Sequence, residues 1–226
     1  MKYLNKFETN ESYDSVKKVA HKSYVSLVTD SDTVVYDKNL NEGVFIQHID
    51  GTLYTTDEWT AGGFVADDAN GVAVVDKKCS FVVAKVNIGK APWLGYTSDI
   101  VEGVFTAYNI EQAITDYNGV ENTVSIVKID NPSAAAYKCD NYTFSNGAKG
   151  YLGSAGEWNV LIKNFNYVQT ALSKVGEQFD TSTGCLYWTS TQSSSHAYII
   201  STCNLITSAQ TKSTSNNVRP FTTLCH

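Results

Sequence analysis

The sequence lacks any cluster of basic residues. Its 17 lysines and arginines never form a run longer than a pair, and the formal net charge of the 226 residues is −6. A domain that binds nucleic acid presents a basic patch or stripe to the phosphates. The sequence therefore predicts no nucleic-acid partner.

Long apolar runs are also missing. The opening residues, MKYLNKFETNESYDS, lack the apolar core of a signal peptide. No stretch approaches the roughly 20 apolar residues that a membrane-spanning helix needs. We therefore expect a chain that folds in a cytoplasm and is not inserted into a membrane.

Cysteine usage is sparse, and it includes no C-x-x-C pair. An odd, scattered set in a chain without a signal peptide favours reduced core residues over disulfides or a metal site. We accordingly expect neither a metal nor another cofactor. The five cysteines are Cys79, Cys139, Cys185, Cys203 and Cys225.

Motifs of catalysis are absent from the most glycine-rich stretch, KGYLGSAGEW. It has no lysine after its last glycine, as a phosphate-binding loop requires, and it lacks the residue that a nucleophile elbow needs before its serine. Ser154 and Glu157 instead form the S-x-x-E capping box of a helix start. His196 follows three serines but has no acidic neighbour in sequence to orient its ring, so no catalytic role is predicted for it.

Strand and turn residues dominate what is present, with 14 tyrosines among the aromatics. Residues 1–58 predict a small β-rich module with one helix after Asn10 and hairpins at 23–38 and 43–59, the second around Asp50-Gly51. A further hairpin is predicted around Asn70-Gly71. The preceding Asp67-Asp68 could suggest a calcium site, but a calcium-binding loop needs further carboxylates that this stretch does not supply, so a turn is favoured. A strand is expected at 80–88.

Helical spacing follows over 107–119, 121–129 and 131–144, with Pro132 in a first helical turn. Behind the capping box, one continuous apolar stripe predicts a helix from Ser154 to Gly176. Strands are expected at 185–191 and 196–203, a polar loop at 204–217, and an edge strand at 218–224, since Pro220 cannot donate to a ladder.

The C-terminal stretch from Tyr187 to Asn217, here termed the neutral block, holds serine, threonine, asparagine, glutamine and tyrosine almost to the exclusion of charge. Such residues combine adaptable hydrogen bonding with rigid aromatic contact, which is the chemistry of a paratope. Composition alone is equally compatible with a merely soluble loop.

Four motifs follow one another over roughly residues 60–226: YNIEQAITDYNGVENT, AAAYKCDNYTFSNGAKGYLGSAGEW, YWTSTQSSSHAY and VRPF. Together they resemble phage, prophage and mobile-element proteins of gut Bacteroidales that carry a C-terminal C-type-lectin-like domain. That domain is related to those of formylglycine-generating enzymes and of retroelement-diversified receptor-binding proteins. The N-terminal KYLNKFETNESYDSVK similarly resembles the opening of Bacteroides phage structural proteins.

The resemblance implies an α+β fold in which two helices pack on short antiparallel sheets. Residues 1–58 would be the module for virion docking or oligomerisation, and 59–226 the C-type-lectin-like domain. The scaffold positions would be Ser154, Glu157, Trp158, Trp188 and Arg219, and the exposed candidates for ligand contact Gln192, Ser193, Ser194, Ser195, His196 and Tyr198.

The implied function is that of a non-enzymatic virion protein, such as a head fibre, decoration or tail-associated protein. Other virion proteins would bind the N-terminal module. The C-terminal face would bind either a host-surface glycan or protein, or only neighbouring virion subunits. We expect a homo-oligomer, by analogy with fibre proteins a trimer. The calcium–sugar motifs EPN and WND are absent, and Cys185 and Cys203 do not match the catalytic cysteines of formylglycine-generating enzymes. A bacterial or mobile-element surface adhesin and an enzyme of the formylglycine-generating type remain as alternatives.

Overall fold

The computed structural model describes residues 42–94, 99–129 and 131–224, and the backbone of three short strands before them. These strands, β1 (Lys2–Leu4), β2 (Ser26–Val28) and β3 (Val34–Tyr36), form an antiparallel sheet in the order β1-β2-β3. The hairpin predicted over 23–38 is therefore confirmed as β2–β3. The helix predicted after Asn10 lies outside the described residues.

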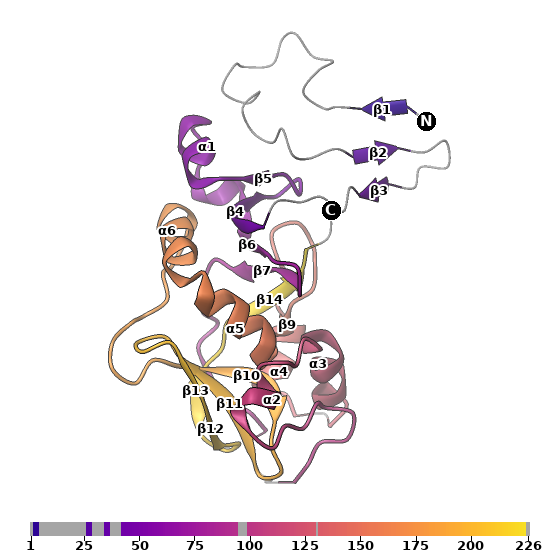
Figure 1. Cartoon of the computed structure of the whole chain (residues 1–226), viewed down its shortest axis with the longest axis vertical. Helices are drawn as coiled ribbons and strands as arrows, with labels where there is room; N and C mark the ends of the chain where they lie inside the picture. The colour runs from indigo at the N-terminus through magenta and orange to yellow at the C-terminus, as the bar shows by residue number, and fades with distance from the viewer. Residues whose placement is uncertain are drawn as a thin grey trace.

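The main body is α+β, with two sheets and six α-helices in the described part of the chain (Figure 1). One sheet is antiparallel, in the order β5 (Leu53–Tyr54), β4 (Gly43–His48), β6 (Ala69–Val75), β7 (Ser80–Ala84), β14 (Pro220–Thr223), β9 (Tyr151–Leu152). The other is mixed, in the order β12 (Ile206–Thr211), β11 (His196–Ser201), β10 (Leu186–Gln192), β13 (Ser215–Asn217), β8 (Lys90–Pro92).

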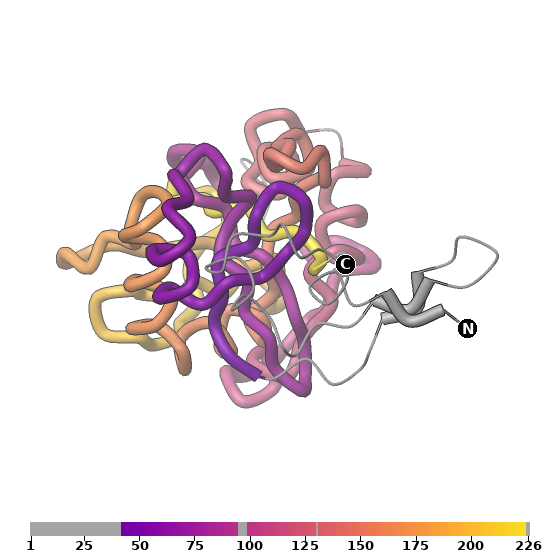
Figure 2. The backbone as a smooth tube through the Cα atoms, turned by 90° about the horizontal axis from the view of Figure 1, so that it is seen from above, coloured from indigo at the N-terminus to yellow at the C-terminus, as the bar shows by residue number. Residues whose placement is uncertain are grey.

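Strand β4 falls within residues 1–58, yet it pairs with β6 along its whole length. A boundary at residue 58 therefore runs through one continuous sheet. The C-terminal β14 joins this sheet too, next to β7, so that segments from both halves of the described chain meet there (Figure 2).

The helices pack against these sheets. The 3-10 turn η1 (Ala66–Asp68) and α1 (Thr56–Ala61) precede β6, and the short α2 (Ile110–Ala113) follows β8. Helices α5 (Ala155–Lys163) and α6 (Phe165–Val175) share an apolar core with residues of both sheets. A second core joins α3 (Gly119–Val127) and α4 (Ala135–Asp140) to β8, β10 and β11.

The capping box is confirmed at the start of α5. The Ser154 hydroxyl accepts from the Glu157 amide, while the Glu157 carboxylate accepts from the Ser154 amide. The predicted single helix is wrong in one respect, because it is interrupted at Asn164, whose φ of −107° and ψ of 15° are not helical. The Asn164 side-chain amide donates to the Val160 carbonyl, and Gly176 ends α6 as predicted.

The hairpin predicted around Asn70-Gly71 is wrong, because both residues lie inside β6. A side chain on Gly71 would bring its Cβ within 2.5 Å of the Val83 carbonyl oxygen, so this glycine permits close strand pairing rather than a turn. Asn70 is buried, and its side chain donates to Gln47 and accepts from the Asn146 amide.

Other local predictions were overturned by packing. The strand at 52–59 ends after β5, where Thr55 caps α1. The strand at 80–88 is the shorter β7, the helix at 107–119 is the single turn α2, and α4 begins after Pro132, at Ala135. The 204–217 loop contains β12 and β13, and β14 lies between β7 and β9 instead of at an edge.

Candidate functional site

The candidate contact residues surround the tight turn between β10 and β11. The Ser193 amide donates to the His196 carbonyl at 2.8 Å, and the His196 amide donates to the Ser193 hydroxyl at 3.1 Å. Ser194 and Ser195 are exposed at the tip, and the Ser195 hydroxyl lies 2.8 Å from Nδ1 of the exposed His196 ring. The turn thus presents three polar side chains from a backbone held by its own hydrogen bonds.

Two of the six candidates are not on the surface. Gln192 is fully buried, and Tyr198 is 3% exposed. The expectation that both are exposed is wrong, because each lies beneath a segment distant in sequence. Tyr198 packs with Ala107 and Ala113, and burial raises its pKa.

Gln192 joins three segments through its side-chain amide. Its Oε1 accepts from the Val101 amide at 3.0 Å and from the Lys212 ammonium at 2.9 Å, while its Nε2 donates to the Val101 carbonyl at 2.7 Å and to the Thr106 hydroxyl at 3.1 Å. Gln192 therefore holds the base of the β10–β11 turn against residues 101–106 and does not contact solvent.

The single lysine of the neutral block, Lys212, is fully buried. Its ammonium donates to the Asp99 carbonyl and to Gln192, and it lies 4.8 Å from the centre of the Trp93 ring. Burial lowers the pKa of Lys212 to about 8. Because the block contains no other lysine, arginine, aspartate or glutamate, its exposed surface carries no such charge.

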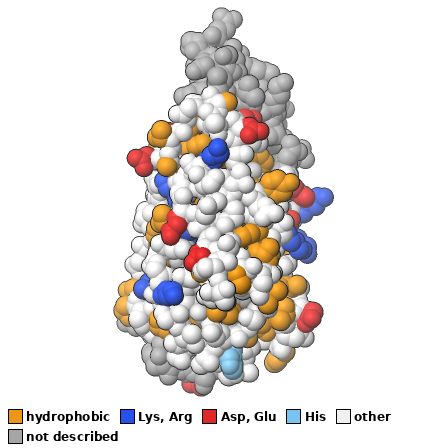
Figure 3. All heavy atoms as spheres, turned by 90° about the vertical axis from the view of Figure 1, so that its left-hand side faces the viewer, with side chains coloured by type: hydrophobic (Ala, Val, Ile, Leu, Met, Phe, Trp, Pro, Cys, Tyr) orange, Lys and Arg blue, Asp and Glu red, His pale blue; other side chains and the backbone are white. Residues whose placement is uncertain are grey.

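The polar side chains of β12 lie in the stretch that was predicted to be a loop. Strand β12 pairs with β11 in a continuous register that places Thr211 opposite His196, and Thr211 is exposed. Strand periodicity could not reveal β12, because neither of its faces is covered by the core and its sequence, ITSAQT, does not alternate. Figure 3, a view of one side of the molecule, shows charged side chains scattered among larger uncharged areas.

The predicted scaffold positions are all interior, since Ser154, Glu157, Trp158, Trp188 and Arg219 are at most 5% exposed. Trp188 donates its indole N–H to the Ala91 carbonyl at 2.9 Å. The Trp158 ring lies 5.1 Å from that of Phe221 and 5.5 Å from that of Tyr187, between the two sheets.

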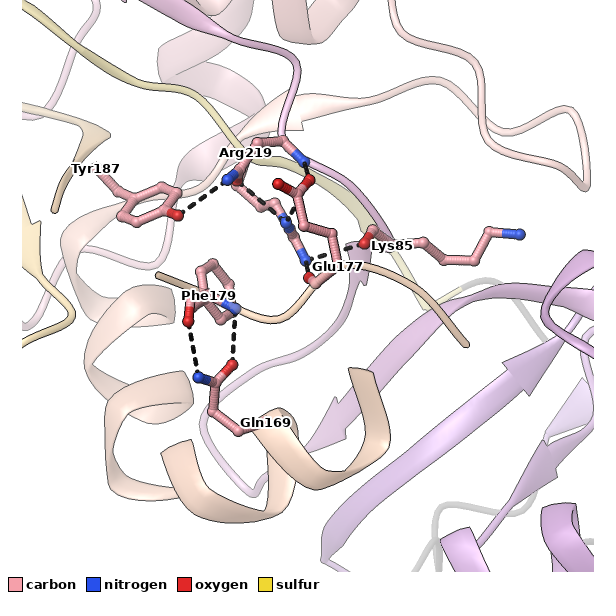
Figure 4. Close-up of polar contacts among 7 residues, drawn as sticks. Lys85, Gln169, Glu177, Phe179, Tyr187 and Arg219 are labelled. Atoms are coloured by element: carbon pink, nitrogen blue, oxygen red, sulfur yellow. Dashed lines mark hydrogen bonds and ion pairs between the residues drawn. The ribbon is translucent and has the colours of Figure 1, made fainter. Parts of the chain in front are cut away.

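Arg219 ties the chain entering β14 to two neighbouring segments, residues 85–87 and 177–179 (Figure 4). One terminal nitrogen donates to Asn87 Oδ1 at 3.1 Å, and the other donates to the carbonyls of Lys85 at 3.1 Å and Glu177 at 2.6 Å. The guanidinium carbon lies 4.6 Å from the centre of the Phe179 ring. Burial lowers the pKa of Arg219 to about 10, a value at which it remains charged at neutral pH.

A second buried polar cluster anchors β10 to the start of α5. Between Trp188 and Gln192, the pairing of β10 with β11 is irregular. In this stretch the Thr191 hydroxyl accepts from the Ala155 amide and donates to Asp116 Oδ2 at 2.6 Å. Desolvation raises the pKa of the Asp116 carboxyl despite its hydrogen bonds.

The histidine, cysteine and acidic side chains of the described residues do not gather into a metal site. No group of three or more histidine, cysteine or acidic side chains there is placed to hold a metal ion. Cys79, Cys139, Cys185 and Cys203 are free thiols; Cys203 is exposed and Cys79 half-buried, so the prediction of core positions fails for these two. Cys225 lies outside the described residues.

Two cavities, of about 450 and 380 Å³, lie away from the neutral block. The larger lies between β4, the start of α1 and α6 and includes Phe45, Thr56 and Tyr167, while the smaller lies beside α3 and β9. No residue of 187–217 lines either cavity. The candidate contact surface of the neutral block is therefore a projecting turn and a strand rather than either of these cavities.

Comparison of the chain with protein-family models, with curated proteins and with solved structures found no match. Among the helices in the described ranges, none combines the length and the apolar character needed to span a bilayer. The fold and the geometry of the neutral block therefore carry the functional argument.

Proposed function

We propose that the chain is a structural protein of a phage virion, without enzymatic activity, and that a C-type-lectin-like domain displays the neutral block to a host surface. Its N-terminal part would attach it to other virion proteins. The sequence motifs named above support the family. Helices packed on small sheets, in an α+β body, are compatible with that domain.

The observation that carries this proposal is the combination of an uncharged surface with a fixed turn. The neutral block exposes hydroxyl and imidazole groups, while its one lysine is buried. A binding segment whose backbone is already fixed loses less conformational freedom on binding. The turn that carries Ser194, Ser195 and His196 meets that condition, because Ser193 and His196 hydrogen-bond across it.

A host-surface glycan is the ligand class that this chemistry favours. Neutral sugars offer many hydroxyl groups, and these pair with serine, threonine and imidazole groups without requiring a charge. The adhesin alternative shares the same fold and binding face. It is distinguished from the virion protein by whether the chain is found on the particle or on the cell surface.

Binding of the purified chain to Bacteroidales cells tests the proposal. We expect Ser195→Asp, which places a carboxylate at the tip of the turn, to weaken binding at least about tenfold, since a carboxylate facing a neutral ligand loses water without gaining an opposite charge. Thr183→Asp is the matched control, because Thr183 is also exposed but precedes β10.

Periodate oxidation of the cells, which destroys sugars, is expected to remove the binding. Binding that survives periodate would indicate a protein receptor. If the unmodified chain fails to bind, or if Ser195→Asp binds as well as Thr183→Asp does, the assignment of this turn as the contact site is wrong.

A further inference from the structure

The outer edge of β12 has no strand partner in the described part of the chain. Strand β12 ends the five-stranded sheet, and all six of its residues pair with β11. Its pairing with β11 contains no bulge. A ladder of backbone groups is therefore available on its other side, where the Thr211 carbonyl also accepts from the Thr214 amide at 3.0 Å.

The hydrogen bonds of the neighbouring turn determine which backbone groups point outward. Ser193 and His196 bond across the β10–β11 turn, so the N–H and C=O of His196 point toward β10. Orientation alternates along an antiparallel pair, so Thr211, opposite His196, does not bond to β11. By the same alternation, Thr207 and Ala209 direct their N–H and C=O groups away from the sheet.

The edge of β12 also lacks the features that protect exposed strand edges. Proteins shorten such strands, place lysine or proline on them, or bend them with a bulge. Strands β5 and β9, at the two edges of the other sheet, have two residues each, and β8 carries Lys90 and Pro92. The sequence of β12, ITSAQT, contains neither charge nor proline.

We propose that β12 pairs with β12 of a second copy of this chain, antiparallel about a two-fold axis at Ala209. In this register Ala209 lies opposite Ala209 of the second copy, and Thr207 lies opposite Thr211 of the second copy. The backbone N–H and C=O groups that point away from β11 in one copy therefore meet the same kind of groups in the other. Threonine pairs opposite each other stabilise antiparallel strands.

Two features favour a second copy of this chain over a strand of a different protein as the partner of β12. The edge is uncharged although the chain has a net charge of −6, so a two-fold axis brings no like charges together there. The pairing is also self-complementary, as two-fold interfaces require. Since it uses the backbone and side chains of β12 alone, it leaves the Ser194–His196 side chains available to a ligand.

Analytical ultracentrifugation of the full chain tests the pairing. We expect a concentration-dependent dimer, and we expect Ala209→Lys to weaken dimerisation at least about tenfold, because two ammonium groups would face each other across the axis. Ala209 is exposed, so the change does not alter the core. Thr183→Lys is the control of equal charge and is expected to dimerise like the unmodified chain.

Amide hydrogen exchange of the unmodified chain provides a second measurement. The Thr207 and Ala209 amides are expected to be protected at concentrations that favour the dimer and to exchange on dilution, whereas the Ser208 and Gln210 amides, which point to β11, stay protected. A chain that is monomeric at every concentration, or an assembly that Ala209→Lys leaves unchanged, would overturn the proposal. A trimer that persists in Ala209→Lys belongs to the second case.

Discussion

Arg219→Ala is expected to lower the free energy of unfolding by about 4 kcal/mol, which is the range for removing one partner from a buried charged network. The substitution removes a fully buried guanidinium that donates to the Glu177 carbonyl, and it takes away one of the two donors to the Lys85 carbonyl, the other being the Glu177 amide. It also removes the cation that lies over the Phe179 ring. Phe179 is itself held in place by two hydrogen bonds between its backbone and the Gln169 side chain. Urea denaturation measures the change.

Two further variants separate the sources of this stability. Arg219→Lys keeps the charge but cannot reach three acceptors in the same plane, so it is expected to lose about half of the stability that Arg219→Ala loses. Glu177→Gln removes a carboxylate that is 55% exposed and 3.9 Å from the guanidinium, and it should cost less than about 1 kcal/mol. A larger loss from Glu177→Gln than from Arg219→Lys would show that the ion pair, and not the carbonyl hydrogen bonds, stabilises this region.

A second large effect is expected from the pH dependence of stability. Glu157 is 5% exposed, and burial raises its pKa from 4.5 to about 7 against the opposing effect of hydrogen bonds from Ser154 and Tyr151. Between these two values the folded chain keeps a proton that the unfolded chain has released. Stability therefore decreases as pH rises, by up to about 3 kcal/mol between pH 4.5 and 7.

Glu157→Gln imitates the protonated carboxyl, because its amide oxygen accepts from the Ser154 amide and its NH₂ group donates to the Tyr151 hydroxyl. We expect this variant to lose most of the decrease in unfolding free energy over that pH range, measured by urea titrations at several pH values. Glu58→Gln changes the same capping motif at the start of α1, where Glu58 is only half-buried, and serves as the control. An unchanged slope in Glu157→Gln would assign the pH dependence to other groups, with Asp116 the first candidate.

Local signals predicted the parts of the structure that local chemistry determines. The Ser154–Glu157 capping box fixed the start of α5, and the polar turn between two strong strand patterns indicated the β10–β11 hairpin. Asn70-Gly71 shows the limit of such reasoning, because a pair that favours turns in isolation lies inside β6, where pairing with β7 requires a glycine.

The candidate site was predicted in part. The tip residues Ser194, Ser195 and His196 are exposed, but Gln192 is buried by residues about 90 positions earlier in the chain, which no local pattern could reveal. Strand β12 was missed because both of its faces lie outside the core, so burial imposes no alternation on its sequence. The burial of Lys212 beside Trp93 and Gln192 likewise depends on contacts that no local pattern encodes.

Electron cryomicroscopy of the intact phage particle would test most directly whether the chain displays the neutral block on a virion. We expect the chain to be present on the particle, attached through its N-terminal part, with Ser194, Ser195 and His196 facing solvent. Absence of the chain from the particle, or burial of these three residues against a neighbouring subunit, would contradict the proposed display function.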